Sequence, residues 1–289
     1  MEDLLRPIYQ ERASELDTLG ILLIEKTRPN SPLTDNFDVI LLIIVDNDNQ
    51  PWHVKHYEFD DKIAALHVVS EDLLMQWIDT STYRRAVEWV IYGKVLFDRN
   101  EYINKLKEEL RSFPSDKRDL RKAIEFGKLI RSYSEAKDLY EISHYKDAYS
   151  RMIHSLHYLA RLAVIEKGFH PEVTVWKQVH QIDPEVYKLY EELIQSNEEI
   201  EKRVQLMILA IDFVISNRAR YSVKHLLDIM EEDSWSYSEL KTHPSLLPYG
   251  LDLTAIMSYL SEKNIIATER VETKGVGVFQ RKYRVNRID

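Results

Sequence analysis

Two acidic residues, Asp35 and Asp38, precede the most apolar stretch of the chain, VILLIIV at residues 39–45. Carboxylates in such a place can hold divalent metal ions, which bridge a triphosphate and activate the attacking oxygen in phosphoryl transfer. Two ligands on one strand share a face when they are two residues apart. Asn36 and Asp38 have this spacing, but Asn36 brings a neutral carbonyl oxygen instead of a charge. The sequence predicts Asp38 and Asp35 as the catalytic and metal-binding carboxylates of an incomplete site.

A structural interpretation of the same residues is equally open. The TDN cluster that contains Asp35 and Asn36 is typical of loops and caps without chemistry. Asp38 adjoins a run of Ile and Leu and needs a partner there, for which Lys26 is the candidate. The neighbouring stretch KIAALHVVS has no carboxylate, so Glu58 would have to serve as the third acid.

The first 117 residues alternate between helical and extended periods, which predicts a mixed α and β domain. Ser70, followed by two acids, marks the start of a helix after the last of these strands. The expected elements are a helix at 2–17, strands at 20–26 and 37–45, and a hairpin formed by 52–59 and 62–70.

Residues 118–220 repeat apolar positions every three or four residues, which predicts an antiparallel helical bundle. Gly168 is the expected end of one bundle helix, and Pro184 is the expected start of another. Residues 221–289 contain three short helical patterns and two extended runs, the order of a winged helix-turn-helix. The fold class is therefore α+β with three domains: a mixed sheet at 1–117, a helical bundle at 118–220 and a winged helix-turn-helix at 221–289.

The helical region carries a row of basic residues that could hold phosphates, although a solvated stripe balanced by neighbouring acids would have the same pattern. The row consists of Arg151, His154, His157 and Arg161. Of these we take Arg151, His154 and Arg161 as candidate ligand contacts.

Bulk composition excludes several classes of protein. The chain has no cysteine, so it has neither a disulfide nor a thiolate site, and we expect a cytoplasmic protein. Its apolar runs are shorter than the roughly 20 residues of a membrane span. Only seven glycines are present and none forms a Gly-rich phosphate loop, which argues against Walker-type and Rossmann-type nucleotide binding.

The stretch LLIEKTRPNSPLTDNFDVILLIIV resembles the N-terminal domain of nucleotidyltransferases, where a Gly-Ser pair is followed by Ser-Asp-x-Asp and an apolar strand. Glu25 and Lys26 replace Gly-Ser here, and Asp38 alone stays in register. Gly93 and Asp98 match the pattern by which such chains leave the sheet. The whole chain is similar to an uncharacterised bacillary nucleotidyltransferase-like family with a helical middle domain and a C-terminal helix-turn-helix.

This resemblance implies a nucleotide or another nucleotide-bearing small molecule as ligand, bound between the first two domains, with transferase activity weak or lost. If activity survives, Mg²⁺ or Mn²⁺ would lie on Asp38 and Asp35. Lys26, Arg28 and Asn36 would then contact the phosphates or the cofactor.

Basic charge is concentrated at the C-terminus. Residues 270–289 carry six Lys or Arg against two acids, whereas residues 221–269 carry three against eight. A wing with this positive charge, at residues 270–289, could contact the phosphate backbone of a nucleic acid. The helix before it, DLTAIMSYLSEKNII, begins with an expected Asp cap but has few donors for base edges.

The alternative function is a ligand-responsive regulator whose wing contacts DNA or a protein. The candidate contacts are Arg270, Lys274, Arg281, Lys282 and Arg284.

Overall fold

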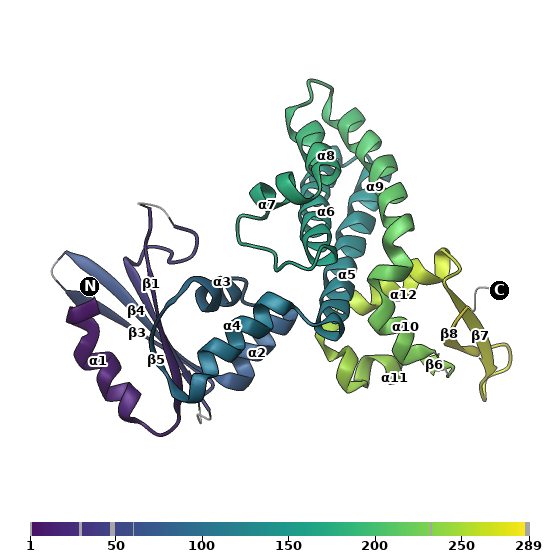
Figure 1. Ribbon diagram of the computed structural model, residues 1–289. Helices are drawn as coiled ribbons and strands as arrows, with labels where there is room; N and C mark the ends of the chain where they lie inside the picture. Colours follow the sequence, from purple (N-terminus) through teal and green to yellow (C-terminus); the bar gives the residue numbers. More distant parts are fainter. Residues whose placement is uncertain (1, 29–30, 47–49, 60, 232, 287–289) are drawn as a thin grey trace. The chain divides into compact units, whose positions relative to one another are not determined.

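The computed structural model describes all residues except 1, 29–30, 47–49, 60, 232 and 287–289 (Figure 1). Arg287, counted above among the basic residues, therefore lies outside the described part of the chain. Contacts divide the chain into two compact units, and each is described by itself below. Unit 1 comprises residues 1–114 and 169–174, and unit 2 comprises residues 115–168 and 175–289.

Unit 1 is built on a five-stranded mixed sheet with strand order β3-β4-β2-β1-β5. Strands β2 and β4 are parallel, and every other neighbouring pair is antiparallel. The predicted hairpin is confirmed, since β3 and β4 have the expected bounds. The strands are β1 (Thr18–Glu25), β2 (Val39–Val45), β3 (Trp52–Phe59), β4 (Lys62–Ser70) and β5 (Lys94–Asp98).

Both faces of this sheet are covered over its central strands, and β2 is apolar and buried at every position. Helix α1 (Glu2–Ser14) packs on one face through Leu5 and Tyr9. Helices α2 (Glu71–Thr80), α3 (Arg85–Tyr92) and α4 (Tyr102–Ser112) pack on the other (Figure 1). The Ser70 hydroxyl accepts the N–H of Leu73, so the predicted start of α2 is confirmed.

Gly93 and Asp98 have structural roles at the exit from the sheet. A Cβ on Gly93 would lie 2.4 Å from the Trp89 carbonyl oxygen, so the tight turn between α3 and β5 requires glycine. The Asp98 carboxylate accepts the N–H groups of Ile103 and Asn104 at 2.8 and 3.3 Å. It thereby satisfies amides at the start of α4, after the short 3₁₀ turn η1 (Arg99–Glu101).

A segment between two helices of unit 2 packs with unit 1. The N–H of Val173 donates to Glu88 Oε1 at 2.6 Å, and the His170 ring stacks on Phe113 with a centroid separation of 3.9 Å. Nothing in the sequence of residues 169–174 marks this segment as part of the sheet domain.

Unit 2 begins with a bundle of helices and continues into a helix-turn-helix with a β wing. The predicted end of one bundle helix at Gly168 is confirmed by its φ of +84°, and Pro184 opens another helix as expected. The bundle helices are α5 (Ser115–Glu141), α6 (Tyr145–Glu166), α7 (Val175–Ile182), α8 (Pro184–Gln195) and α9 (Ile200–Ser222). The following elements are α10 (Lys224–Met230), β6 (Trp235–Ser236), α11 (Tyr237–Thr242), η2 (Pro244–Tyr249), α12 (Asp252–Glu262), β7 (Ile266–Glu272) and β8 (Phe279–Val285).

One hydrophobic core joins the bundle to the helix-turn-helix, because α12 packs closely on α5. The absence of a side chain at Gly127 allows this approach: a Cβ there would lie 2.8 Å from Ile256 Cδ1. The Asp252 carboxylate forms an ion pair of 2.7 Å with Arg131 of α5. The expected Asp cap was wrong: Asp252 lies inside α12, and no side chain caps this helix.

We expect Gly127→Leu to lower the free energy of unfolding of the full chain by about 1–3 kcal/mol, since the added side chain would collide with Ile256 across a packed interface. Chemical denaturation followed by circular dichroism measures this change. Lys137→Leu, at an exposed position of the same helix, is the matched control and should change stability by less than about 0.5 kcal/mol. Equal effects of the two substitutions would contradict the close packing of α5 on α12.

Candidate functional site

Asp38 lies directly before β2 and ties the start of this strand to β4. Its Oδ2 accepts the N–H of Ile63 at 3.0 Å, and its own N–H donates to the Ile63 carbonyl at 2.9 Å. The expected partner Lys26 contributes its backbone N–H, which donates to the Asp38 carbonyl at 2.9 Å. The partner of the Asp38 carboxylate is therefore a backbone amide of the neighbouring strand, which sequence reasoning missed.

Asp35 fixes the loop before β2 to helix α3. Both carboxylate oxygens accept hydrogen bonds from Arg85, one from Nη1 and one from Nη2, in a two-pronged ion pair. Trp89 of the same helix donates its Nε1–H to the Leu33 carbonyl at 2.8 Å. Asp35 also has φ = +50°, a left-handed conformation that Asp tolerates better than most residues. The TDN loop is thus fastened by side chains of α3.

The carboxylates do not fit a two-metal site as folded. The two oxygens of Asp35 are engaged by a guanidinium, and one oxygen of Asp38 is engaged by an amide. Asn36 and Glu58 are exposed, on the loop and on β3 respectively. Among the described residues, no group of three or more His, Asp or Glu side chains has a metal-binding arrangement. Metal binding by Asp35 and Asp38 stays a prediction.

The two candidate phosphate-binding cations of unit 1, Lys26 and Arg28, come directly after strand β1 in the sequence. Lys26 is half-buried and Arg28 is exposed, in the same stretch of chain that leads to the Asp35 loop. Their role as phosphate contacts stays a prediction.

A cluster of aromatic rings lies beside Asp35 and Arg85. His67 of β4 is 7% exposed, and its Nδ1 lies 3.3 Å from Trp52 Nε1, which donates to it. The His67 ring contacts Trp89 edge-on, while Trp77 and Tyr83 complete the cluster at centroid separations of 4.6–5.7 Å. Burial, with a smaller contribution from the charge of His56, lowers the pKa of His67 to about 4. His67 is therefore neutral at pH 7 and can accept the indole hydrogen bond.

The low pKa of His67 links stability to pH. Histidine in the unfolded chain titrates near pH 6.5, so between pH 6.5 and 4 the unfolded state binds more protons and stability falls as the pH falls. We expect His67→Gln, which keeps an acceptor but does not titrate, to remove up to about 3 kcal/mol of this loss. Urea denaturation at several pH values between 4 and 7 measures the slope. An unchanged slope in the variant would show that His67 is not the group responsible.

The predicted basic row on α6 is divided in the structure. Arg151 and His154 are exposed, and Arg151 pairs with Glu135 at 3.1 Å. Arg161 is 1% exposed and lies 3.2 Å from the buried carboxylate of Glu125. Burial alone would raise the pKa of Glu125, but the charges of Arg161 and its cationic neighbours outweigh it and hold the pKa at about 2. The cations of α6 therefore do not form one exposed surface.

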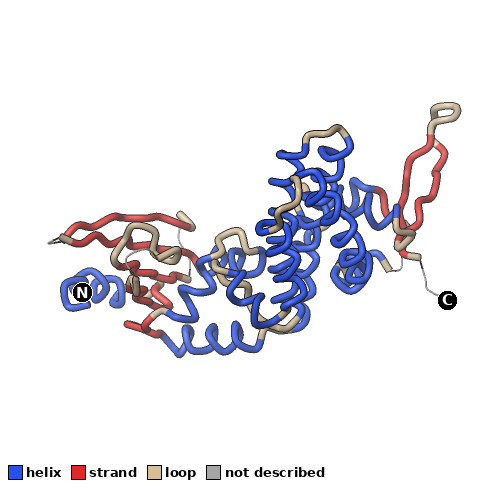
Figure 2. Tube along the Cα trace, turned by 90° about the horizontal axis from the view of Figure 1, so that it is seen from above, coloured by secondary structure: helices blue, strands red, loops and turns tan. Residues whose placement is uncertain are grey.

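The wing is the most exposed part of the C-terminal region. Figure 2 shows the β7–β8 hairpin extending from the helices of unit 2, with its loop at the tip. Val276 at this tip is fully exposed. Arg284 pairs with Glu269 at 2.9 Å, and the Arg270 guanidinium lies over the Phe279 ring at 5.9 Å. Lys274 and Arg281 are exposed as well, whereas Lys282 is half-buried.

Helix α12, in the position of a recognition helix, is buried on most of its surface. Its exposed side chains at successive turns are Thr254, Ser258 and Glu262, and it contains neither Lys nor Arg. Ile256 and Tyr259 face α5, where Tyr259 contacts the Phe126 ring at 6.0 Å. The exposed stripe thus has no cationic donor for a base edge or a phosphate.

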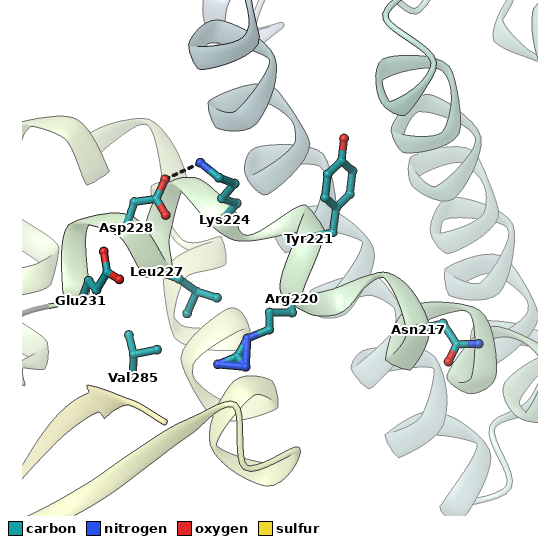
Figure 3. Close-up of a pocket in the computed structure, with 8 residues that line it drawn as sticks. All are labelled: Asn217, Arg220, Tyr221, Lys224, Leu227, Asp228, Glu231 and Val285. Atoms are coloured by element: carbon teal, nitrogen blue, oxygen red, sulfur yellow. Dashed lines mark hydrogen bonds and ion pairs between the residues drawn. The ribbon is translucent and has the colours of Figure 1, made fainter. Parts of the chain in front are cut away.

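A cavity of about 530 Å³ lies in unit 2 where α9, α10 and the end of β8 meet (Figure 3). Lys224 Nζ is 2.7 Å from Asp228, and Arg220 donates to the Asn286 carbonyl at 2.6 Å. The cations at this cavity are already engaged within the chain, so the cavity does not favour an anionic ligand. No sequence signal predicts it. The lining residues are Asn217, Arg220, Tyr221, Lys224, Leu227, Asp228, Glu231 and Val285.

Comparison with known proteins supplies the family. The model of a nucleotidyltransferase-like domain matches residues 1–118, that of a YgxA-like substrate binding domain matches 119–218, and that of a helix-turn-helix domain matches 224–285. The uncharacterized protein YgxA of Bacillus subtilis (strain 168) is 49% identical over 98% of this chain and 97% of its own length. The chain belongs to the YgxA-like family of nucleotidyltransferase-like proteins.

A solved structure agrees with this assignment. The crystal structure of a nucleotidyltransferase-like protein from Exiguobacterium sibiricum 255-15 is 38% identical, superposes with a TM-score of 0.83 and covers 99% of both chains. The predicted resemblance and the α+β fold class are therefore confirmed for this YgxA-like chain. Its helices, over the described residues, all fall short of the length and apolarity that crossing a bilayer requires.

Proposed function

We propose that this YgxA-like protein binds a nucleotide or a nucleotide-bearing ligand through its nucleotidyltransferase-like domain without transferring the nucleotidyl group. The observation that carries the proposal is the engagement of Asp35 by Arg85 and of Asp38 by Ile63, within a fold that belongs to nucleotidyltransferase-like proteins. A carboxylate held by a guanidinium is a poor ligand for a divalent ion, because the cation would have to displace the paired charge.

Retention of the fold supports ligand binding, and the loss of free carboxylates supports the absence of transfer. Lys26 and Arg28 are the candidate phosphate contacts of unit 1, and the exposed Arg151 and His154 are those of the helical domain, whereas Arg161 is buried against Glu125 and is not available to a ligand. If transfer survives, Mg²⁺ or Mn²⁺ would have to be held by Asp38 with Asp35 released from Arg85. A cytoplasmic location stays a prediction from the sequence.

The full chain should bind ATP or GTP measurably by isothermal titration calorimetry, while pyrophosphate release in Mg²⁺ or Mn²⁺ stays at the level of a protein-free control. Metal-dependent release that disappears in Asp38→Asn would show that the transferase activity is intact. If the chain binds neither ATP nor GTP, the proposal as a whole is overturned.

A second candidate function is contact with nucleic acid through the wing, favoured by the exposed Lys274 and Arg281 on a hairpin that extends from its unit. Because α12 exposes only short polar groups and one acid, the wing would contact the phosphate backbone without sequence selectivity. A wing that contacts a protein is the other outcome of the test.

We expect wild-type protein to bind a mixed-sequence DNA duplex with an affinity that falls steeply between 50 and 200 mM salt. The double substitution Lys274→Ala and Arg281→Ala should reduce the slope of log affinity against log salt by about 2, since each phosphate contact contributes about 1. Fluorescence polarisation measures the affinity at each salt concentration, and hence the slope. The matched control replaces Lys137 and Lys202, two exposed lysines of the bundle, by Ala. Binding that is insensitive to salt, or equally affected by the control, would favour a protein partner.

A further inference from the structure

Strand β3 leaves part of one sheet face uncovered. Residues paired across neighbouring strands share a face, and β3 pairs Trp52 with Val69, Val54 with His67 and His56 with Ala65. Ala65 and Val69 belong to the core under α2, α3 and α4, so these side chains of β3 lie on the same face. Trp52 is nevertheless 40% exposed and Val54 is 38% exposed. At the β3 edge, the face that the helices cover elsewhere is open.

Aromatic side chains form much of this open area. The Phe37 ring, on the loop that leads from Asp35 to β2, lies 4.7 Å from the His56 ring. Trp52 is two residues from Val54 and four from His56, on the same side of the strand. We call Phe37, Trp52, Val54 and His56 the aromatic strip. It adjoins the Asp35 loop, so it belongs to the same end of the domain as the candidate site.

The Trp52 ring is fixed on its inner side by contacts with His67 and Trp77. It is nearly parallel to His67, with an interplanar angle of 16° and a centroid separation of 6.0 Å, and its Nε1–H donates to His67. Trp77 meets it edge-on at 5.1 Å, and Trp77 and Trp89 are themselves buried. An aromatic plane that is fixed by buried rings and exposed outward loses little entropy when a planar ligand stacks on it.

The charges beside the strip favour a planar group over a phosphate. Arg85 lies next to the aromatic cluster, where it already forms the two-pronged pair with Asp35. The pair is neutral as a unit, so it offers a phosphate little net attraction. The aromatic surface is therefore the feature of this face with the strongest expected affinity for part of a nucleotide, namely its base.

We propose that the aromatic strip is the nucleobase site of this domain, with the base stacked on the outer face of Trp52. This inference rests on the proposed nucleotide-binding function and adds the position and the mode of base recognition. Stacking accepts every base, because each has a π face, so discrimination between ATP and GTP at the strip is weak. The neutral His67 ring behind Trp52 keeps the indole in place and does not itself contact the base.

The test is calorimetric titration of the full chain with ATP and with GTP. Trp52→Leu should weaken binding by roughly 5- to 150-fold, the range of base–aromatic stacking, whereas Trp52→Phe should retain most of the affinity because it keeps an aromatic plane. Lys55→Leu is the matched control: it is exposed on the same strand, it is predicted by alternation to point to the other face, and it should bind as the wild type does.

Val54→Glu gives a second variant in case loss of the indole disturbs folding. Val54 is exposed on an edge strand, so the change should leave the melting temperature within a few degrees of the wild type while placing a negative side chain beside the base. Photo-crosslinking with 8-azidoadenosine triphosphate supplies an independent readout. The modified peptide should contain residues 52–59 or Phe37.

The outcomes separate this inference from the proposed function. If wild type binds neither nucleotide, both are overturned. If it binds and Trp52→Leu and Val54→Glu bind equally well, or the crosslink maps outside the strip, nucleotide binding stands and the assignment of the strip is wrong. Selective loss in Trp52→Leu and Val54→Glu, with most of the affinity kept in Trp52→Phe and all of it in Lys55→Leu, would establish the strip as the base site.

Discussion

The architecture of unit 1 depends on the complete burial of one strand. All seven side chains of β2 are apolar and at most 2% exposed. Each such side chain contributes about 1.5–3 kcal/mol when it leaves water, an upper estimate for a real unfolded chain. A strand without a solvated face needs partners on both edges and cover on both faces. Strands β1 and β4, helix α1 and the layer of α2, α3 and α4 meet these requirements.

Burial of this strand also decides what its polar neighbours can do. Amides and carboxylates at the end of a buried strand must find partners, and Asp38 finds its partner in Ile63 of β4. Asp35 pairs with Arg85, which holds the loop on α3. Both carboxylates thus stabilise the structure around β2. The open face beside them is aromatic instead of acidic, which suits recognition better than phosphoryl transfer.

In unit 2, too, packing limits which residues of the helix-turn-helix can contact a partner. The helix-turn-helix shares one core with the bundle, α12 packs on α5 at Gly127, and the exposed stripe of α12 carries no Lys or Arg. The wing extends from this core and exposes Lys274 and Arg281. In this region the helices therefore pack with the bundle, while the hairpin offers the exposed cations.

Local signals in the sequence were sufficient for most of the secondary structure: alternation gave the bounds of β3 and β4, Gly168 marked the end of a helix and Pro184 the start of another. Such signals act over a few residues, so a single chain displays them. The partners of the candidate site lay beyond their range, since Arg85 is 50 residues from Asp35 and Ile63 is 25 residues from Asp38. A carboxylate in a sequence has the capacity to bind a metal, a guanidinium or an amide. Which of these it binds is decided when packing brings one of them within hydrogen-bonding distance.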